Sequence, residues 1–229
     1  MSNNLTVKQS DLCRKLDVVF QEPRLLEQAL THRSVGSFNN ERLEYLGDAI
    51  LNFVIAETLY KHFPKEKEGK LSRLRASLVK GITLAEIGRE LDLGTVLILG
   101  PGELKSGGFR RESILADAVE AIFGAVYLDG GMDASKALIL HLFEERIKAI
   151  DISEADKDPK TTLQEYLQSR KQPLPIYEVK DVTTTEKQPV FEASCQISLL
   201  NKLIVAKGTS HRKAEQAAAN RVLKIVQGM

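Results

Sequence analysis

The spacing of apolar side chains predicts a first part of the chain that is helical nearly throughout. From residue 8 to about residue 150, apolar residues recur every three or four positions, which is the period of an amphipathic helix. Proline and glycine divide this part into separate elements. Helices are expected to open at Pro23 and to cover about 40–62, 70–81, 83–91, a stretch from about 113 to Gly130-Gly131, and 132–150.

The pattern changes after residue 158. Three stretches rich in β-branched residues, 177–182, 190–199 and 203–208, predict strands. They lie between a helix expected at 160–171 and an alanine-rich helix expected at 214–226. The polar segment 151–158 has the composition of a linker. The chain is therefore predicted to be multidomain, with an all-α domain over 1–150 and a small α+β domain of order α-β-β-β-α over 159–229.

A row of carboxylates marks the helix expected at 40–62. Glu41, Glu44 and Asp48 share one face because of their spacing, while Leu43 and Ile50 lie on the opposite face. Like charges at such spacings destabilise a helix by a few tenths of a kcal/mol. A bound divalent cation removes this penalty, because Mg²⁺ and Mn²⁺ prefer oxygen ligands. This face is therefore predicted to bind metal.

A second acidic pair lies in the 113–124 stretch, which is otherwise apolar or small apart from the serine at its start. Asp117 and Glu120 are three residues apart, so they lie on the same helix face, and Gly124 is expected to leave room beside them. Burying two carboxylates without partners costs several kcal/mol. The pair is therefore expected either to reach a metal-binding cleft or to form salt bridges with nearby arginines. A further acid, Glu68, is ambiguous by itself.

Three blocks of sequence, in this order, resemble the motifs of bacterial ribonuclease III: ERLEYLGDAI at 41–50, EGKLSRLRASLV at 68–79 and FRRESILADAVEAIFG at 109–124. The resemblance implies an endonuclease that cleaves double-stranded RNA with Mg²⁺, for which Mn²⁺ can substitute, to 5′-phosphate and 3′-hydroxyl ends. It implies metal ligation by Glu44, Asp48, Asp117 and Glu120, and catalytic roles for Asp48, Glu120, Glu41 and Glu68, the last two as supporting acids. It also suggests ribosomal RNA precursors, some messengers and transfer RNA as substrates.

The second part of the chain resembles the double-stranded-RNA-binding domain. PKTTLQEYLQ at 159–168 and GTSHRKAEQAAA at 208–219 carry this likeness. Such domains contact 2′-hydroxyls and phosphates, because the bases of duplex RNA are out of reach. One helix face suits 2′-hydroxyls, and it consists of Thr161, Gln164, Glu165 and Gln168. A group expected just before the last helix suits phosphates, and it consists of Ser210, His211, Arg212 and Lys213.

Two further sets of basic residues are candidate RNA contacts. The loop between the first two strands, 183–189, lacks the histidine usual in the family, and Lys187 is nearest to the expected place. Lys105, Arg110 and Arg111 lie in a glycine-rich loop before the second acidic helix. They are predicted to contact phosphate close to the scissile strand, with a solvated basic loop as the alternative.

Charge and composition limit the possible functions. The chain of 229 residues has a net charge of +1, but residues 157–229 hold 12 Lys and Arg against 7 Asp and Glu, so the remainder is acidic. This division suits an acidic catalytic part and a basic part that binds phosphates. No stretch is long and apolar enough for a membrane span, and the N-terminus lacks the pattern of a secretion signal. Cys13 and Cys195 predict reduced thiols in a cytoplasmic protein, without zinc.

The chain has one set of acidic motifs, and one catalytic centre cuts one strand. Cutting both strands of a duplex therefore predicts a homodimer. Tyr45, beside Glu44, is expected either at a subunit interface, where the family has an aromatic residue, or in the core. His32 is expected to be structural. Two other interpretations are compatible with parts of this pattern. One is a duplex-RNA-binding regulator that does not cut, and the other is a domain that binds Ca²⁺ or Mg²⁺ only for stability.

Overall fold

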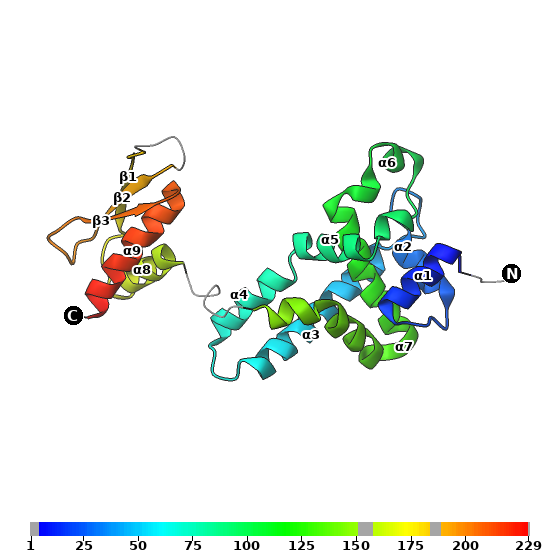
Figure 1. The fold of residues 1–229 in the computed structure, drawn as a ribbon. Helices are drawn as coiled ribbons and strands as arrows, with labels where there is room; N and C mark the ends of the chain where they lie inside the picture. Colours follow the sequence, from blue (N-terminus) through cyan, green and yellow to red (C-terminus); the bar gives the residue numbers. More distant parts are fainter. Residues whose placement is uncertain (1–4, 151–157, 184–188, 229) are drawn as a thin grey trace. The chain divides into compact units, whose positions relative to one another are not determined.

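Two long helices form the centre of the first part of the chain (Figure 1). Helix α3 (Glu41–His62) packs against α7 (Glu112–Lys148), which is interrupted at Gly131, where φ is 79° and ψ is −174°. The backbone can take this conformation because glycine has no Cβ. The interruption confirms the predicted division between two helices. This computed structural model describes residues 5–150, 158–183 and 189–228, and it separates the chain into two compact units, 1–155 and 156–229.

Shorter helices surround this pair. They are α1 (Val7–Leu16), α2 (Pro23–Leu30), α4 (Glu68–Leu78), α5 (Gly81–Glu90) and α6 (Pro101–Lys105), with single 3₁₀ turns at Leu93–Thr95 and Gly108–Arg110. The glycine-rich segment expected as a loop therefore contains a short helix, which Pro101 starts because its fixed φ suits the first helical position. Fully buried Leu51, Ile55, Phe123 and Phe143 belong to the core of this unit.

Two glycines allow α3 and α7 to touch backbone to backbone. A Cβ on Gly47 would lie 1.7 Å from the Glu120 carbonyl oxygen, and a Cβ on Gly124 would lie 2.3 Å from the Leu43 carbonyl oxygen. Any larger residue would push the helices apart. Gly124 leaves room beside the acids, as expected, and the backbone of α3 at Leu43 occupies that room.

The second unit is a three-stranded antiparallel sheet with two helices packed together on it (Figure 1). The strands are β1 (Ile176–Asp181), β2 (Phe191–Gln196) and β3 (Ile204–Gly208), in the order β1-β2-β3. Helix α9 (His211–Gln227) packs against β2, β3 and helix α8 (Pro159–Ser169). Buried Leu163, Leu167, Ala193 and Val222 fill the space between the helices and the sheet.

The predicted fold class, an all-α domain followed by a small α+β domain, is confirmed. In the second unit the order of elements is also as predicted, but α9 begins three residues before the expected start. The Ser210 hydroxyl caps it by accepting the backbone N–H of Lys213 at 3.2 Å, which makes His211 the first helical residue. The predicted linker, except Asp158, and Lys187 lie outside the described residues. Among the described helices, none has the length and apolar character that a bilayer crossing requires.

Candidate metal centre and nucleic-acid interface

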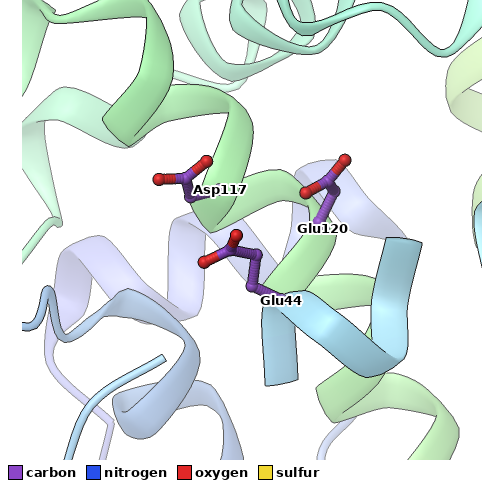
Figure 2. Close-up of side chains that lie close together, drawn as sticks. All are labelled: Glu44, Asp117 and Glu120. Carbon is purple, nitrogen blue, oxygen red and sulfur yellow. The ribbon is translucent and has the colours of Figure 1, made fainter. Parts of the chain in front are cut away.

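Three carboxylates meet where α3 and α7 face each other (Figure 2). Glu44 reaches from α3 toward the side of α7 that carries Asp117 and Glu120. Each residue offers a carboxylate oxygen, and these oxygens all lie within 4.8 Å of one another. The close approach at Gly47 and Gly124 sets this distance, because it fixes the separation of the two helices. Two segments about 70 residues apart in sequence thus converge on one half-buried cluster.

The electrostatics of this cluster favour a bound cation. Burial and the charges of Asp48, Glu44 and Asp117 raise the pKa of Glu120 to about 8. Burial also raises the pKa of Glu44 and of Asp117, and the charge of Asp117 raises that of Glu44 further. Half-buried carboxylates so close together repel each other unless a cation or a proton lies between them. An all-oxygen set of this kind fits a hard divalent cation.

The salt-bridge alternative does not hold for these three groups. Within the described residues the structure shows no ion pair on Glu44, Asp117 or Glu120. By contrast, Glu112 at the start of α7 pairs with Arg89 at 2.9 Å. The acids of the cluster therefore differ from an ordinary acid on the same helix, because no ion pair to them is formed within the described residues.

Asp48 and Glu41 flank the cluster on α3 and are more exposed. The Asp48 carboxylate accepts a hydrogen bond from Asn52 Nδ2 at 2.8 Å, and its charge raises the pKa of Glu44 and Glu120. The Glu41 carboxylate lies 3.3 Å from Arg33 Nη1. Both are close to the cluster, but neither is one of the three acids whose oxygens converge.

Glu68 is not brought to this cluster within one chain. It begins α4 and lines a hollow of about 370 Å³ together with Ala56 and Tyr60, from the C-terminal half of α3. Glu44 lies twelve residues before Ala56, which is about 18 Å along a helix. The Glu68 carboxylate accepts a hydrogen bond from Ser72 Oγ at 2.7 Å.

His32 and Arg33 lie near the cluster. The sequence pattern indicated a role for His32 but not for Arg33. His32 Nδ1 is 2.8 Å from Ser34 Oγ and accepts the Ser34 backbone N–H at 3.2 Å, which suits the predicted structural role. The charge of His32, when its ring is protonated, and the charge of Arg33 lower the pKa of Asp117. Nothing in the local sequence around Arg33 distinguishes it from an ordinary surface arginine.

In the second unit, the predicted 2′-hydroxyl face is exposed as expected. The four residues of that face, Thr161, Gln164, Glu165 and Gln168, all lie on the solvent side of α8. Leu163 and Leu167, on the other side, are fully buried. The structure thus gives these polar side chains access to a ligand.

The residues predicted to bind phosphate form the cap and first turn of α9. Ser210 is occupied as the helix cap, and the His211 ring packs against the Phe191 ring at 4.4 Å. Arg212 and Lys213 are exposed, with Arg212 3.7 Å from Asp158. Asp158, which was assigned to the linker, instead caps α8 and accepts a hydrogen bond from Gln216 at 2.7 Å. An Asp directly before a proline is a capping signal that could have identified it.

The basic residues before α7 divide into different environments. Arg111 pairs with Glu103 at 2.8 Å. Arg110 lies over the Phe109 ring, 5.0 Å from its centroid, and lines a hollow with Lys8 and Arg89. Lys105 is exposed at the end of α6.

Comparison with known proteins identifies both parts of the chain. Residues 22–147 match the model of a family described as ribonuclease-III-like, and residues 159–226 match the double-stranded RNA binding motif. A Ribonuclease 3 of Colwellia psychrerythraea is 58% identical over 94% of this chain and 81% of its own length. This chain belongs to the ribonuclease III family. A Ribonuclease 3 of Psychromonas ingrahamii is 55% identical over 98% of the chain and 99% of its own length.

A solved structure agrees with this assignment. The nuclease domain of ribonuclease III from Campylobacter jejuni superimposes with a TM-score of 0.61 at 42% identity, covering 64% of this chain and all of that domain. As a ribonuclease III, the protein is an endoribonuclease that acts on double-stranded RNA and uses a divalent metal. The resemblance stated from the motifs is thereby confirmed.

Proposed function

We propose that this ribonuclease III hydrolyses both strands of duplex RNA with Mg²⁺, for which Mn²⁺ can substitute, leaving 5′-phosphate and 3′-hydroxyl ends and short 3′ overhangs. The observation that carries the proposal is the convergence of Glu44, Asp117 and Glu120 within 4.8 Å, with no ion pair to any of them among the described residues. The three acids would hold metal directly, and Asp48 would join them by giving up Asn52. Glu41 would support the site from its edge.

The side chains of this chain have no covalent role in the proposed reaction. Mg²⁺ held by these residues would supply an activated water and positive charge for the phosphoryl oxygens and the departing 3′-oxygen. Glu44 and Asp117 would fix the position of that charge from two helices, and the contact at Gly47 holds those helices together. The half-buried setting of Glu120 limits competing water, which strengthens the electrostatic interactions there.

The two domains divide the work in this proposal. Residues 1–150 would catalyse and dimerise, and residues 159–229 would bind RNA through the α8 face and the first turn of α9. Lys187, Lys105, Arg110 and Arg111 would add phosphate contacts, of which Arg111 must compete with Glu103. The proposed setting is the cytoplasm, where the free thiols Cys13 and Cys195 stay reduced. The proposed substrates are ribosomal RNA precursors and some messenger and transfer RNAs.

A homodimer would supply the second cleft, and the outer face of α3 is its proposed interface. Tyr45, Phe53 and Tyr60 are 81%, 57% and 72% exposed on that helix, so Tyr45 is not a core residue. Exposed aromatic residues on one helix face mark an interaction surface. One solved relative is described as flexible in a region involved in dimer formation of its nuclease domain; it is 43% identical, has a TM-score of 0.59, and covers 60% of this chain and 97% of that domain.

The dimer would also explain where Glu68 acts. In a twofold pair, α3 helices that cross antiparallel place the Tyr45 end of one against the Tyr60 end of the other. Tyr45 could then enter the hollow that Glu68 lines. Because Tyr45 follows Glu44 directly, the partner's Glu68 would approach the carboxylate cluster of this chain, which Glu68 of the same chain does not reach.

Cleavage of an end-labelled perfect RNA duplex tests the proposal. With Mg²⁺ we expect staggered cuts in both strands, 5′-phosphate products and second-order assembly of the active dimer. With Ca²⁺ we expect binding in a gel shift without cutting. Binding without cutting in Mg²⁺ and Mn²⁺ would instead support a regulator that does not cleave.

Sedimentation of the full chain tests the dimer separately. Tyr45→Asp should shift the dimer toward monomer and lower cleavage at low enzyme concentration. A wild-type chain that stays monomeric at micromolar concentration and still makes staggered cuts would contradict the dimer.

A further inference from the structure

Arg33 is a cation at the edge of the carboxylate cluster. Its Nη1 lies 3.3 Å from Glu41 Oε1, and 70% of its side chain is exposed. Its charge lowers the pKa of Glu44 on α3 and of Asp117 on α7. The guanidinium therefore acts on carboxylates of both helices, while most of it faces solvent.

The backbone on both sides of Arg33 is held in place. The His32 backbone N–H donates to the Ile98 carbonyl at 2.9 Å, and the Gly100 backbone N–H donates to Ser34 Oγ at 2.9 Å. A Cβ on Gly100 would lie 2.3 Å from the Ser34 carbonyl oxygen, so only glycine permits this packing. Arg33 thus projects from a segment whose position is fixed by hydrogen bonds and close packing, as a group that must meet a substrate accurately requires.

We propose that Arg33 is a catalytic residue whose guanidinium binds a non-bridging oxygen of the phosphate being cleaved. This inference rests on the proposed metal-dependent hydrolysis. A guanidinium carries five N–H donors in a planar fork that matches phosphate. The ion pair with Glu41 uses Nη1, and the exposure of the side chain leaves other donors accessible.

Arg33 acts by charge in the reaction and transfers no proton. The oxygen of a water molecule forms a bond to phosphorus, and the bond between phosphorus and O3′ breaks. The attacking water loses a proton to solvent, and the 3′-oxygen gains one from solvent. Negative charge grows on the phosphoryl oxygens on the way to the transition state, and a fixed cation there lowers the barrier more than it strengthens binding.

A merely structural role for Arg33 predicts a different result. If Arg33 only offsets repulsion between Glu41 and its acidic neighbours, its removal changes how much Mg²⁺ the cluster needs. The rate at saturating Mg²⁺ would then stay the same. Measuring the single-turnover cleavage rate across a Mg²⁺ titration separates the two roles.

The test compares the full-length wild type with Arg33→Ala, Arg33→Lys and Arg42→Ala. Arg42→Ala is the matched control because it removes the same charge next to Glu41, from the first turn of α3. We expect Arg33→Ala to lower the rate at saturating Mg²⁺ by about tenfold to a hundredfold, with duplex affinity in Ca²⁺ changed less than about twofold. Arg33→Lys should recover part of the rate, and Arg42→Ala should behave as wild type.

Three outcomes overturn the proposal while the proposed function stands. An unchanged maximal rate for Arg33→Ala would assign it only to charge balance. An equal loss of rate and of affinity in Ca²⁺ would make it a binding contact without a catalytic role. An equal loss of rate in Arg42→Ala would reduce the effect to general charge. A wild type that does not cut would instead overturn the proposed function, and the role of Arg33 with it.

Discussion

Like charges lie in opposite environments in two regions of the molecule. The carboxylates between α3 and α7 are half-buried, and the cations at the start of α9 are exposed. Glu44, Asp117 and Glu120 are half-buried and converge within 4.8 Å. Burial raises the pKa of all three, and the charges of neighbouring carboxylates raise the pKa of Glu44 and Glu120 further. Arg212 and Lys213 are exposed, and Arg212 has an acidic neighbour 3.7 Å away. Uncompensated charge that is held by the core needs a specific ligand, whereas solvated charge gives general affinity for phosphates.

This comparison predicts that the two regions can be inactivated separately, and the acids should give the largest effect. Glu120→Gln keeps the size of the side chain but removes a metal ligand. We expect cleavage to fall on the order of a thousandfold. Duplex binding in Ca²⁺, measured by gel shift, should change less than about twofold.

Glu112→Gln is the control for that variant. It removes a carboxylate from the same helix, where the acid is paired with Arg89 and exposed. Its cleavage rate should match that of the wild type. A similar loss in both variants would mean that the charge of α7, and not the cluster, controls activity.

The contact between helices should give the next largest effect. The Cβ introduced by Gly47→Ala would lie 1.7 Å from the Glu120 carbonyl oxygen, so the helices must separate. We expect a loss of about 3 kcal/mol or more in the free energy of unfolding, together with loss of cleavage. Urea unfolding followed by circular dichroism at 222 nm measures it.

Gly102→Ala is the matched control for Gly47→Ala. No atom lies within 4 Å of a Cβ at Gly102, which is also helical, in α6. Its free energy of unfolding should be unchanged or slightly higher. Equal destabilisation by both substitutions would contradict the role assigned to the α3–α7 contact.

The sequence indicated which acids are candidates for the cluster, but not which of them converge. Helical spacing placed Glu44 and Asp48 on one face, and unpaired acids in an apolar run marked Asp117 and Glu120. The convergence of three acids depends on the distance between two helices, which Gly47 and Gly124 set through contacts far apart in sequence.

Two other features could not be predicted from the local sequence pattern, for similar reasons. Glu68 follows the first motif closely in sequence, yet α4 packs at the far end of α3, so motif order does not give its place. The start of α9 depends on a hydroxyl of Ser210 that accepts one N–H, and propensity alone gave a start at Ala214. The wider fold was predictable because periodicity reports which face is buried, and it does so over many residues.

A smaller effect is expected on the basic side of the comparison. Lys213→Ala removes one exposed cation from the first turn of α9. Duplex affinity should fall about two- to fivefold at moderate salt, and the slope of log affinity against log salt should fall by about one. Cleavage at saturating RNA should be unchanged, because Lys213 is not part of the metal cluster.

Lys224→Ala tests whether position or only charge matters there. Lys224 is exposed on the same helix, about 16 Å further along. It should leave both the affinity and the salt slope close to wild type. Equal losses in the two variants would replace a defined contact by the overall charge of the unit.

The smallest effect concerns pH and arises only on the acidic side. In the metal-free protein the pKa of Glu120 is raised to about 8, from its ordinary value of 4.5. Between these values the folded state keeps a proton that the unfolded chain has lost. Stability of the metal-free protein should therefore fall as pH rises through this window. Mg²⁺ binds the ionised form, so its stabilising effect should grow over the same window.

Melting curves by circular dichroism at pH 6 and pH 8.5, with and without Mg²⁺, measure this difference. We expect Mg²⁺ to raise the melting temperature by a few degrees more at pH 8.5, where about 2–4 °C corresponds to 1 kcal/mol. Glu120→Gln should remove most of this pH dependence, because its side chain cannot ionise, while Glu112→Gln should retain it. Equal Mg²⁺ effects at both pH values in the wild type would show that the cluster is already ionised without metal. The uncompensated charge that distinguishes α7 from the start of α9 would then have to be stabilised by groups other than a bound cation.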